Sequence, residues 1–287
     1  MFCFPDDITN LFLSDLACER YRADLNREGV SYDRMSCPCG VWERIEITSA
    51  QGAESIGRPI GYYDTLTLGS LNTLDRDAAQ AAKKEVASEL ERLTEKMHIS
   101  ADRLLVVGLG NPALAPDSVG THTAQNVKAT MHIKELDEQF FSSIACSEIA
   151  VIAPGVKSSS GIDAAVQARG ICQMIKPDAV IAIDSLTALA PERLGKTIQF
   201  SSTGVIPGSG VGNHRSALDE SSLGTPVISI GIPTVISSDA FCHKINSENE
   251  LSSNRKMLVA PQEIDEIARS AGNIISDGIN LAFGIFC

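Results

Sequence analysis

The stretch that most constrains how this chain can fold runs from Leu104 to Gly120 and reads LLVVGLGNPALAPDSVG. Its first four residues form a short apolar run, which is typical of a buried strand. The run ends in Gly108-Leu109-Gly110, and a loop then presents Asp117 before a helical pattern begins. In α/β proteins, catalytic and ligand-binding groups gather in loops at the carboxyl ends of the strands. The stretch therefore predicts an α/β fold with Asp117 at such a position.

Strand-like and helix-like segments alternate along most of the chain. Apolar residues at helical spacing predict helices over residues 75–98, 118–133, 162–175 and 263–283, and apolar or alternating runs predict strands over 42–48, 62–68, 104–107, 149–153, 179–183, 197–201 and 227–232. This order predicts one compact domain over residues 1–287, with a parallel or mixed sheet covered on both sides. Residues 1 to about 40 lack a clean period, and we expect them to be weakly packed. The first 60 or so residues are expected to form an appendage to this domain.

Composition narrows the function classes. Lys and Arg total 24 and Asp and Glu total 36, so the formal charge of the 287 residues is −12, which argues against direct binding of nucleic acid. No apolar run approaches the roughly 20 residues that cross a bilayer, and the N-terminus lacks the positive region of a secretory signal. The eight cysteines are scattered, which suggests reduced thiols in the cytoplasm. Cys37 and Cys39 have no second Cys or His pair at zinc spacing, so we expect no metal site.

A second acidic residue, Asp184, follows the apolar strand predicted over 179–183. Two acids that follow two core strands can converge on one cleft, where neighbouring carboxyl groups share a proton. Such a pair can activate a water molecule against a peptide carbonyl and protonate the leaving amine. The structural alternative is that Asp117 and Asp184 each cap the N-terminus of a helix.

Two glycine-containing loops suggest binding sites. Residues 108–113 keep part of a dinucleotide-binding motif, but two prolines lengthen the loop before the helix, so we do not favour a nucleotide site. The loop over residues 207–213, PGSGVGN, could form a backbone cradle for an extended peptide or an oxyanion, or simply a flexible connection. A similar small-residue loop follows the strand at 149–153. The substrate-binding candidates are Gly155, Ser209, Gly210, Gly212 and Asn213.

These motifs together resemble the germination proteases of spore-forming bacteria, which degrade small acid-soluble spore proteins. The matching stretches are IGRPIG (56–61), LLVVGLGN (104–111), APGV (153–156), PDAVIAIDSL (177–186), TIQFSSTGVIPGSGVGN (197–213) and LGTPVISIGIPTV (223–235). They occur in order over nearly the whole chain. A serine nucleophile elbow and the duplicated Asp-Thr/Ser-Gly of two-lobed aspartic proteases are both missing from the sequence.

The resemblance implies an aspartate-dependent endopeptidase without a cofactor, whose catalytic residues fall on Asp117 and Asp184. It also implies a three-layer αβα fold with a mixed, mostly parallel sheet, related to that of hydrogenase-maturation endopeptidases. The implied partners are small acid-soluble spore proteins as substrates and further copies of the chain in a homotetramer. The implied location is the cytoplasm of the forespore and the spore core, with no membrane and no direct nucleic-acid contact.

The resemblance further implies a zymogen that removes its own N-terminal propeptide. The family's processing site is an acid, a bulky apolar residue and then Ala-x-Glu, and residues 15–19, DLACE, fit this pattern. We therefore expect cleavage between Asp15 and Leu16, which removes residues 1–15. Because that site resembles the cleavage sequence of the substrates, we expect the propeptide to occupy the substrate cleft.

Several positions depart from the family pattern. The segment between Val235 and Leu258 lacks an insert that many members carry, and residues 118–122, SVGTH, replace the usual Ala-Leu-Gly-Pro-Lys. The usual Leu-Ala-Ala-Arg is replaced by residues 186–189, LTAL, which lack the basic residue. Two alternatives remain open: a nickel-dependent maturation endopeptidase with Asp117 and Asp184 as metal ligands, or a binding homologue without activity.

Overall fold

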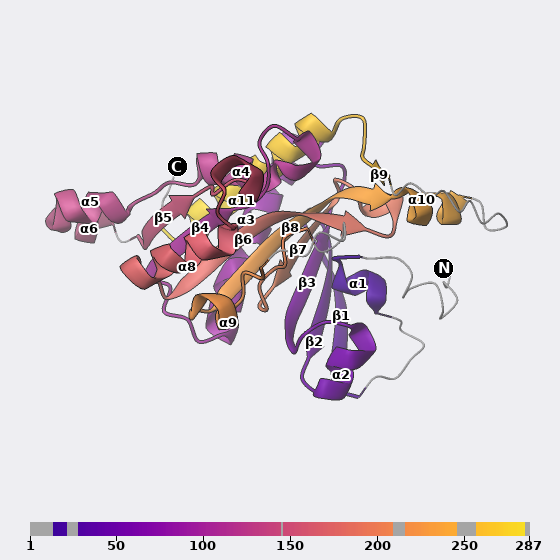
Figure 1. The fold of residues 1–287 in the computed structure, drawn as a ribbon, viewed down its shortest axis with the longest axis horizontal. Helices are drawn as coiled ribbons and strands as arrows, with labels where there is room; N and C mark the ends of the chain where they lie inside the picture. The colour runs from indigo at the N-terminus through magenta and orange to yellow at the C-terminus, as the bar shows by residue number, and fades with distance from the viewer. Residues whose placement is uncertain (1–13, 22–27, 145, 209–215, 246–256, 285–287) are drawn as a thin grey trace.

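The computed structural model describes residues 14–21, 28–144, 146–208, 216–245 and 257–284 (Figure 1). Their centre is a nine-stranded sheet in the order β1-β2-β3-β7-β8-β6-β4-β5, with β9 paired to β8. The strands are β1 (Val30–Cys37), β2 (Gly40–Ile47), β3 (Gly61–Thr67), β4 (Arg103–Gly108), β5 (Glu148–Ile152), β6 (Ala179–Ala188), β7 (Thr197–Ser201), β8 (Val227–Ser237) and β9 (Leu258–Val259).

Helices cover both faces of the sheet. Alternate residues of one strand face opposite layers, so Ile181 packs with α3 (Arg76–Lys96), α4 (Val119–Asn126) and α11 (Ile264–Ala282), whereas Val180 packs with α8 (Ala164–Ile175) and α9 (Glu220–Leu223). Beyond α8 on that second face, α1 (Ala17–Arg20) and α2 (Ala50–Ile56) cover the sheet near β2 and β3. The remaining elements are η1 (Ala115–Asp117), α5 (Met131–Leu136), α6 (Glu138–Ile144), α7 (Lys157–Ser160), η2 (Pro191–Arg193) and α10 (Ser238–Ile245).

The sheet confirms the expected mixed, three-layer architecture, but its parallel ladders do not predominate. Parallel pairing is confined to β5, β4, β6 and β8, whereas β7, β3, β2, β1 and β9 are added by antiparallel pairing. The part of the first 60 residues that the structure describes is therefore no appendage, because β1 and β2 extend the main sheet through β3 and β7 (Figure 1). The sequence gives only a weak strand pattern at β1, because the residues of β1 are exposed or only half-buried.

The helix predicted over residues 118–133 is interrupted. It splits into α4 and α5 because Thr130 pairs with the edge strand β5 instead of continuing the helix. The backbone N–H of Thr130 donates to the carbonyl of Ile149 at 2.9 Å, and its hydroxyl accepts from the N–H of Ile149 at 2.8 Å. These bonds satisfy polar groups on the open side of β5, where no further strand is paired among the described residues.

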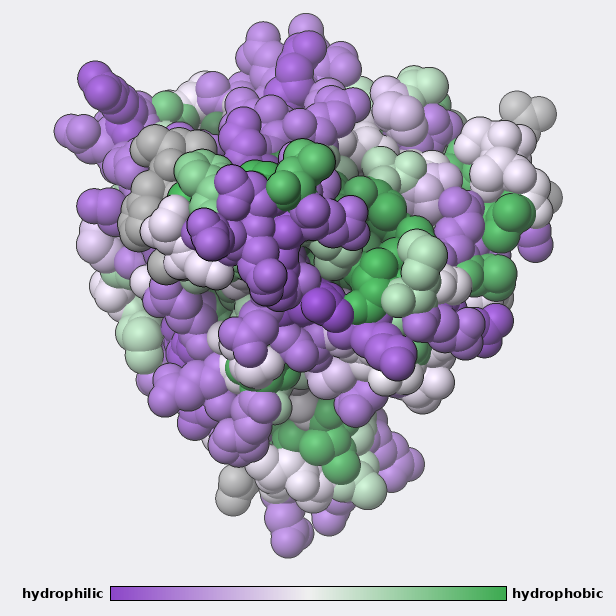
Figure 2. Space-filling model, turned by 90° about the vertical axis from the view of Figure 1, so that its left-hand side faces the viewer, coloured by the Kyte–Doolittle hydropathy of each residue, from purple (hydrophilic) through white to green (hydrophobic). Residues whose placement is uncertain are grey.

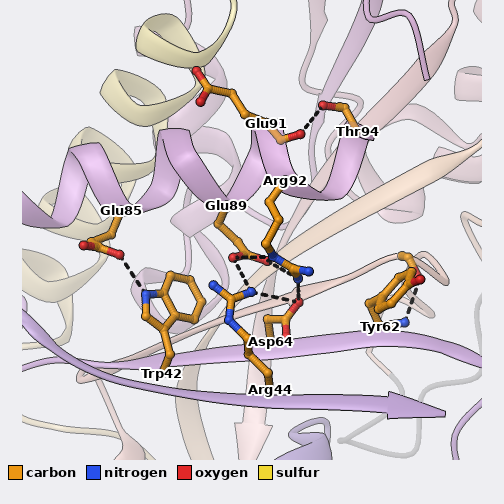
Figure 3. A network of polar contacts seen from close by, with 10 residues as sticks. Trp42, Arg44, Tyr62, Asp64, Glu85, Glu89, Glu91, Arg92 and Thr94 are labelled. Carbon is orange, nitrogen blue, oxygen red and sulfur yellow. Dashed lines mark hydrogen bonds and ion pairs between the residues drawn. The ribbon is translucent and has the colours of Figure 1, made fainter. Parts of the chain in front are cut away.

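A buried polar network ties β2 and β3 to α3 (Figure 3). Asp64 on β3 and Glu89 on α3 are 2% and 1% exposed, and both contact Arg44 and Arg92. The N–O distance is 2.7 Å from Arg44 Nη1 to Glu89 Oε2 and 2.7 Å from Arg92 Nη2 to Glu89 Oε1. The Arg44 guanidinium also lies 4.7 Å from the centre of the Trp42 ring. The arginines thus compensate two carboxyl groups that burial alone would destabilise.

This network predicts a pH dependence of stability. Burial, followed by the neighbouring Glu89 carboxylate, raises the pKa of Asp64 to about 8 from 3.8. The folded chain then binds a proton that the unfolded chain releases, so the stabilisation is complete below pH 3.8 and is lost as the pH rises to about 8. The free energy of unfolding should fall by up to about 1.4 kcal/mol per pH unit in this window. Urea titrations of the wild type and Asp64→Asn at several pH values measure this fall. If the difference in free energy of unfolding between the two proteins does not change with pH, the prediction is wrong.

The face of the molecule in Figure 2 is largely hydrophilic. Figure 2 shows the end of the molecule that carries α5 and α6, where hydrophilic residues cover most of the face and smaller hydrophobic patches lie among them. Exposed apolar side chains in these elements and in α8 include Leu136, Phe140 and Met174. In the described ranges, every helix is too short or too polar to cross a membrane.

Candidate active site

Asp117 ends the short helix η1, in the loop that follows strand β4. The loop folds back tightly, because the N–H of Asn111 donates both to the carbonyl oxygen of Asp117, at 2.8 Å, and to its Oδ2, at 3.0 Å. Gly110 makes this turn with φ of 108°, and a Cβ there would lie 2.0 Å from the Asp117 carbonyl oxygen. The hydroxyl of Thr234 donates to the carbonyl of Pro116 at 2.7 Å and anchors the loop to β8. The position of Asp117 is therefore fixed from two sides.

Asp184 lies within β6 and is 4% exposed. Its Oδ1 accepts a hydrogen bond from the N–H of Ser185 at 2.9 Å. The start of α4, which follows Asp117, packs directly on β6, since a Cβ on Gly120 would lie 2.4 Å from the carbonyl oxygen of Ile183. This close approach brings the elements that carry the two acids together.

Both acids line one pocket of about 330 Å³. The structure therefore brings Asp117 and Asp184 together, as the strand-end argument predicted. Thr187 of β6 and Thr234 of β8 also line the pocket, and so does Asp15 from the N-terminal segment. A cavity that joins two carboxyl groups to a peptide segment has the composition that acid–base hydrolysis of a peptide requires.

The N-terminal segment from Ser14 onward binds alongside β6. The N–H of Asp15 donates to the carbonyl of Thr187 at 2.9 Å, and the N–H of Thr187 donates to Asp15 Oδ2 at 2.9 Å. Arg58 donates to the carbonyl of Ser14 at 2.6 Å and lies 4.0 Å from the Asp15 carboxylate. Asp15 is thus held through its backbone and its side chain.

The residues that follow Asp15 are buried more deeply. Leu16 and Ala17 are both 0% exposed and pack with Leu186 and Ile236 of the sheet. The side-chain amide of Gln199 on β7 contacts the backbone on both sides of Leu16: Nε2 donates to the carbonyl of Asp15 at 2.9 Å, and Oε1 accepts from the N–H of Ala17 at 2.7 Å. The expectation of a weakly packed N-terminus is wrong for this segment.

Glu19 anchors the C-terminal part of this N-terminal segment. Its carboxylate accepts hydrogen bonds from the N–H groups of Leu189 and Ala190, each at 2.8 Å, and from the hydroxyl of Ser14. Burial raises the pKa of Glu19 above its usual range, and the bond from Ser14 and those from the two backbone N–H groups act in the opposite direction. The backbone N–H groups of Leu189 and Ala190 therefore form a binding site for a glutamate carboxylate at this position.

The other predicted site residues are placed less completely. Ser209, Gly210, Gly212 and Asn213 lie outside the described residues, although the adjoining Gly208 lines the same pocket as Asp117 and Asp184. Gly155 follows the edge strand β5 with φ of 68° and lines neither that pocket nor the one beside Gln199. Substrate binding by these five residues stays a prediction.

Sequence reasoning missed Gln199. The signal was present, because Gln199 alternates with the buried Ile198 and Phe200, so that its side chain faces the opposite layer from theirs. A polar residue on a buried strand points to a partner on that face. Its partner is the backbone of the N-terminal segment, which is too distant in sequence to be inferred from local pattern.

A metal centre has no preassembled ligand set in the part of the chain that the structure describes. There, His, Cys, Asp and Glu side chains form no group of three or more that could hold an ion. Cys37 and Cys39 lie with their sulfur atoms 3.8 Å apart, as an isolated pair.

Replacing Gly110 with alanine should disturb the pocket without removing any functional side chain. The added Cβ would overlap the Asp117 carbonyl oxygen, and alanine is strained at this backbone angle. We expect the loop to shift and any activity that depends on Asp117 to fall by about 10²-fold, as a misplacement of about 1 Å can do. Gly224→Ala is the control, because its φ is 70° but a Cβ there would meet no atom within 4 Å. Equal activity of the two variants would contradict this role of Gly110.

Comparison with known proteins identifies the family of this chain. The sequence profile of a peptidase family described as germination protease matches residues 26–247. The germination protease of Clostridium perfringens is 32% identical over 309 aligned residues, which cover 94% of each chain. That of Bacillus subtilis is 36% identical over 234 residues, covering 79% of this chain and 63% of the relative.

A search of solved structures finds the NiFe hydrogenase maturation protease HycI of Thermococcus kodakarensis. It aligns with 67% of this chain and 99% of its own, at 17% identity and a TM-score of 0.38. The sequence comparisons decide the family: this chain belongs to the germination protease family.

Proposed function

We propose that the protein is an aspartate-dependent endopeptidase that initiates the degradation of small acid-soluble spore proteins during germination. The observation that carries this proposal is the position of Asp15, which lines the same pocket as Asp117 and Asp184. Asp15 precedes the bond that the family pattern marks for processing. A chain segment with a cleavage sequence therefore occupies the site where two acids meet.

Acid–base hydrolysis by this pair needs two proton transfers, one bond formed and one bond broken. One carboxylate takes a proton from a water molecule, whose oxygen then forms a bond to the carbonyl carbon of Asp15. The other carboxyl group gives its proton to the nitrogen of Leu16, and the carbon–nitrogen bond breaks. A shared proton lets the two acids play opposite roles, since neighbouring carboxyl groups do not both ionise easily.

The docked segment accounts for the recognised sequence. Leu16 and Ala17 fill fully buried positions. A polar residue in place of Leu16, or a residue larger than alanine in place of Ala17, would weaken binding of the segment. Glu19 binds the N–H groups of Leu189 and Ala190, which are available to any glutamate that is presented on the same short helical turn as in α1. Substrates with an acid, a bulky apolar residue, alanine and then glutamate two residues later fit these positions.

In the same proposal the chain is made as a zymogen, and cleavage between Asp15 and Leu16 removes residues 1–15. The active form is a homotetramer located in the forespore and spore core. Exposed apolar side chains such as Leu136 and Met174 support assembly, because an isolated subunit leaves them in water. Sedimentation analysis tests the assembly, and a monomer at all concentrations would overturn that part.

Incubation of the purified chain with a purified small acid-soluble spore protein tests the central proposal. We expect fragments cut on the C-terminal side of the acid in the recognised sequence, and a new N-terminus at Leu16 in the protease itself, both identified by mass spectrometry. Binding without fragments would instead support a homologue without activity. Cleavage that is lost on removal of bound nickel would support the metal-dependent alternative.

A further inference from the structure

The carbonyl group of the Asp15–Leu16 peptide bond is held by a single side chain from the sheet. Gln199 Nε2 donates to this carbonyl oxygen at 2.9 Å, and Gln199 is 7% exposed. Its amide orientation is fixed by its partners, because the N–H of Ala17 requires an acceptor and the carbonyl of Asp15 requires a donor. The amide nitrogen therefore faces the oxygen of the bond proposed for cleavage.

The sheet places Gln199 in one row with the catalytic acid. Asp184 of β6 pairs with Gly231 of β8, and Gly231 pairs in turn with Gln199 of β7. Residues directly opposite each other on neighbouring strands project from the same face of a sheet. Gly231 carries no side chain, and the space above it is filled by the side chain of Leu186. Asp15 lines both the pocket of Asp184 and the adjoining pocket that Gln199 and Gly231 line.

We propose that Gln199 is a catalytic residue that stabilises the oxyanion formed from the Asp15 carbonyl oxygen. The inference rests on the proposed function, since it requires that the Asp15–Leu16 bond is the one cleaved. When the water oxygen bonds to the carbonyl carbon, the electron pair of the C=O double bond moves onto the oxygen that Gln199 already contacts. The pair returns as the bond to the Leu16 nitrogen breaks, and the nitrogen takes a proton from the acid pair.

A neutral amide suits this position. A donor fixed before the reaction needs no reorganisation when negative charge develops, and removing one such donor typically lowers the rate by about 10²–10³-fold. The second hydrogen bond, from Ala17 to Oε1, holds the amide plane in place without adding charge beside Asp117 and Asp184. Gln199 thus binds the backbone on the C-terminal side of the cleaved bond, at Ala17, and also donates a hydrogen bond to the reacting oxygen.

Two variants of the full-length chain separate these roles. Gln199→Glu keeps an acceptor for the N–H of Ala17 but lacks the N–H donor, and Gln199→Met lacks both groups at similar volume. We expect the first-order rate constant of self-processing to fall by about 10²-fold or more in both variants. Lowering the pH should partly restore Gln199→Glu relative to the wild type, because a protonated carboxyl group can donate to the carbonyl oxygen, whereas Gln199→Met should show no such recovery.

Protection of Cys18 reports whether the segment stays bound. Burial of Cys18 raises its pKa to about 12, so a thiol reagent should label it only after the segment leaves the sheet. Labelling is assigned by fragment masses that distinguish Cys18 from Cys3. We expect slow processing of Gln199→Glu with Cys18 still protected, and Gln80→Glu on the exposed face of α3 should behave as the wild type.

Processing of both Gln199 variants at the wild-type rate would overturn the inference. A slow Gln199→Glu variant with Cys18 exposed, and without recovery at low pH, would also overturn it and leave Gln199 a docking residue. The proposed function fails by a separate result: if Asp184→Asn processes itself normally, the acid pair does not cleave this bond, whatever the Gln199 variants do.

Discussion

Asp184→Asn should abolish self-processing. Asparagine keeps the size of the side chain and an oxygen that can accept from the N–H of Ser185, so the fold is retained, but it neither takes a proton from water nor shares one with Asp117. We expect the rate of cleavage between Asp15 and Leu16 to fall by about 10³-fold or more, within the range for loss of a general acid–base group. Asp117→Asn should have a comparable effect, because both steps need the pair.

Intact-mass measurements over time follow the loss of residues 1–15 in each variant. Asp277→Asn on α11 is the matched control, since Asp277 is 40% exposed and forms a surface ion pair with Lys83, away from the pocket. Both active-site variants should remain folded by circular dichroism. Normal processing in either of them would disprove a shared-proton mechanism.

Replacing Arg92 with methionine should lower the free energy of unfolding by about 3 kcal/mol, because it leaves the buried Asp64 and Glu89 with one compensating arginine. Arg92 contacts both acids, and its guanidinium lies 5.9 Å from the centre of the Tyr62 ring, so methionine preserves much of the apolar packing (Figure 3). The loss is therefore assigned mainly to the polar contacts of the guanidinium with the two carboxyl groups.

Urea denaturation measures this change, with Lys83→Met as the control. Lys83 pairs with Asp277 at 2.7 Å on the surface, where the two side chains are 26% and 40% exposed, and removing an exposed pair should cost less than about 1 kcal/mol. Equal losses in the two variants would show that burial adds nothing to the Arg92 contacts.

The sequence predicted the parallel half of the sheet better than its antiparallel half. The apolar runs at Leu104 and Ala179 lie on central strands that are buried on both faces, so hydrophobicity alone marks them. β1 lacks that signal, because its position at the sheet edge leaves Asp33 and Arg34 exposed. The break between α4 and α5 was also hidden, since the partner of Thr130 lies on β5 rather than nearby in the chain.

The candidate site shows the same division. Asp117 and Asp184 could be predicted, because Asp117 follows the apolar strand β4 and Asp184 follows the apolar run over residues 179–183, although β6 itself continues to Ala188. Gln199 and Thr187 could not, since their role depends on a contact with Asp15 made across more than 170 residues. The resemblance supplied the cleavage sequence, but only the fold brings that sequence to the two acids.

Leu16 remains part of the chain after processing, because the proposed cleavage falls on its N-terminal side. The buried side chains of Leu16 and Ala17, and the carboxylate of Glu19, then form a product that is still covalently attached. A group on a short tether competes as if present at about millimolar concentration. Every incoming substrate must displace this attached competitor, so the strength of its anchoring sets how much substrate the protease needs before it turns over.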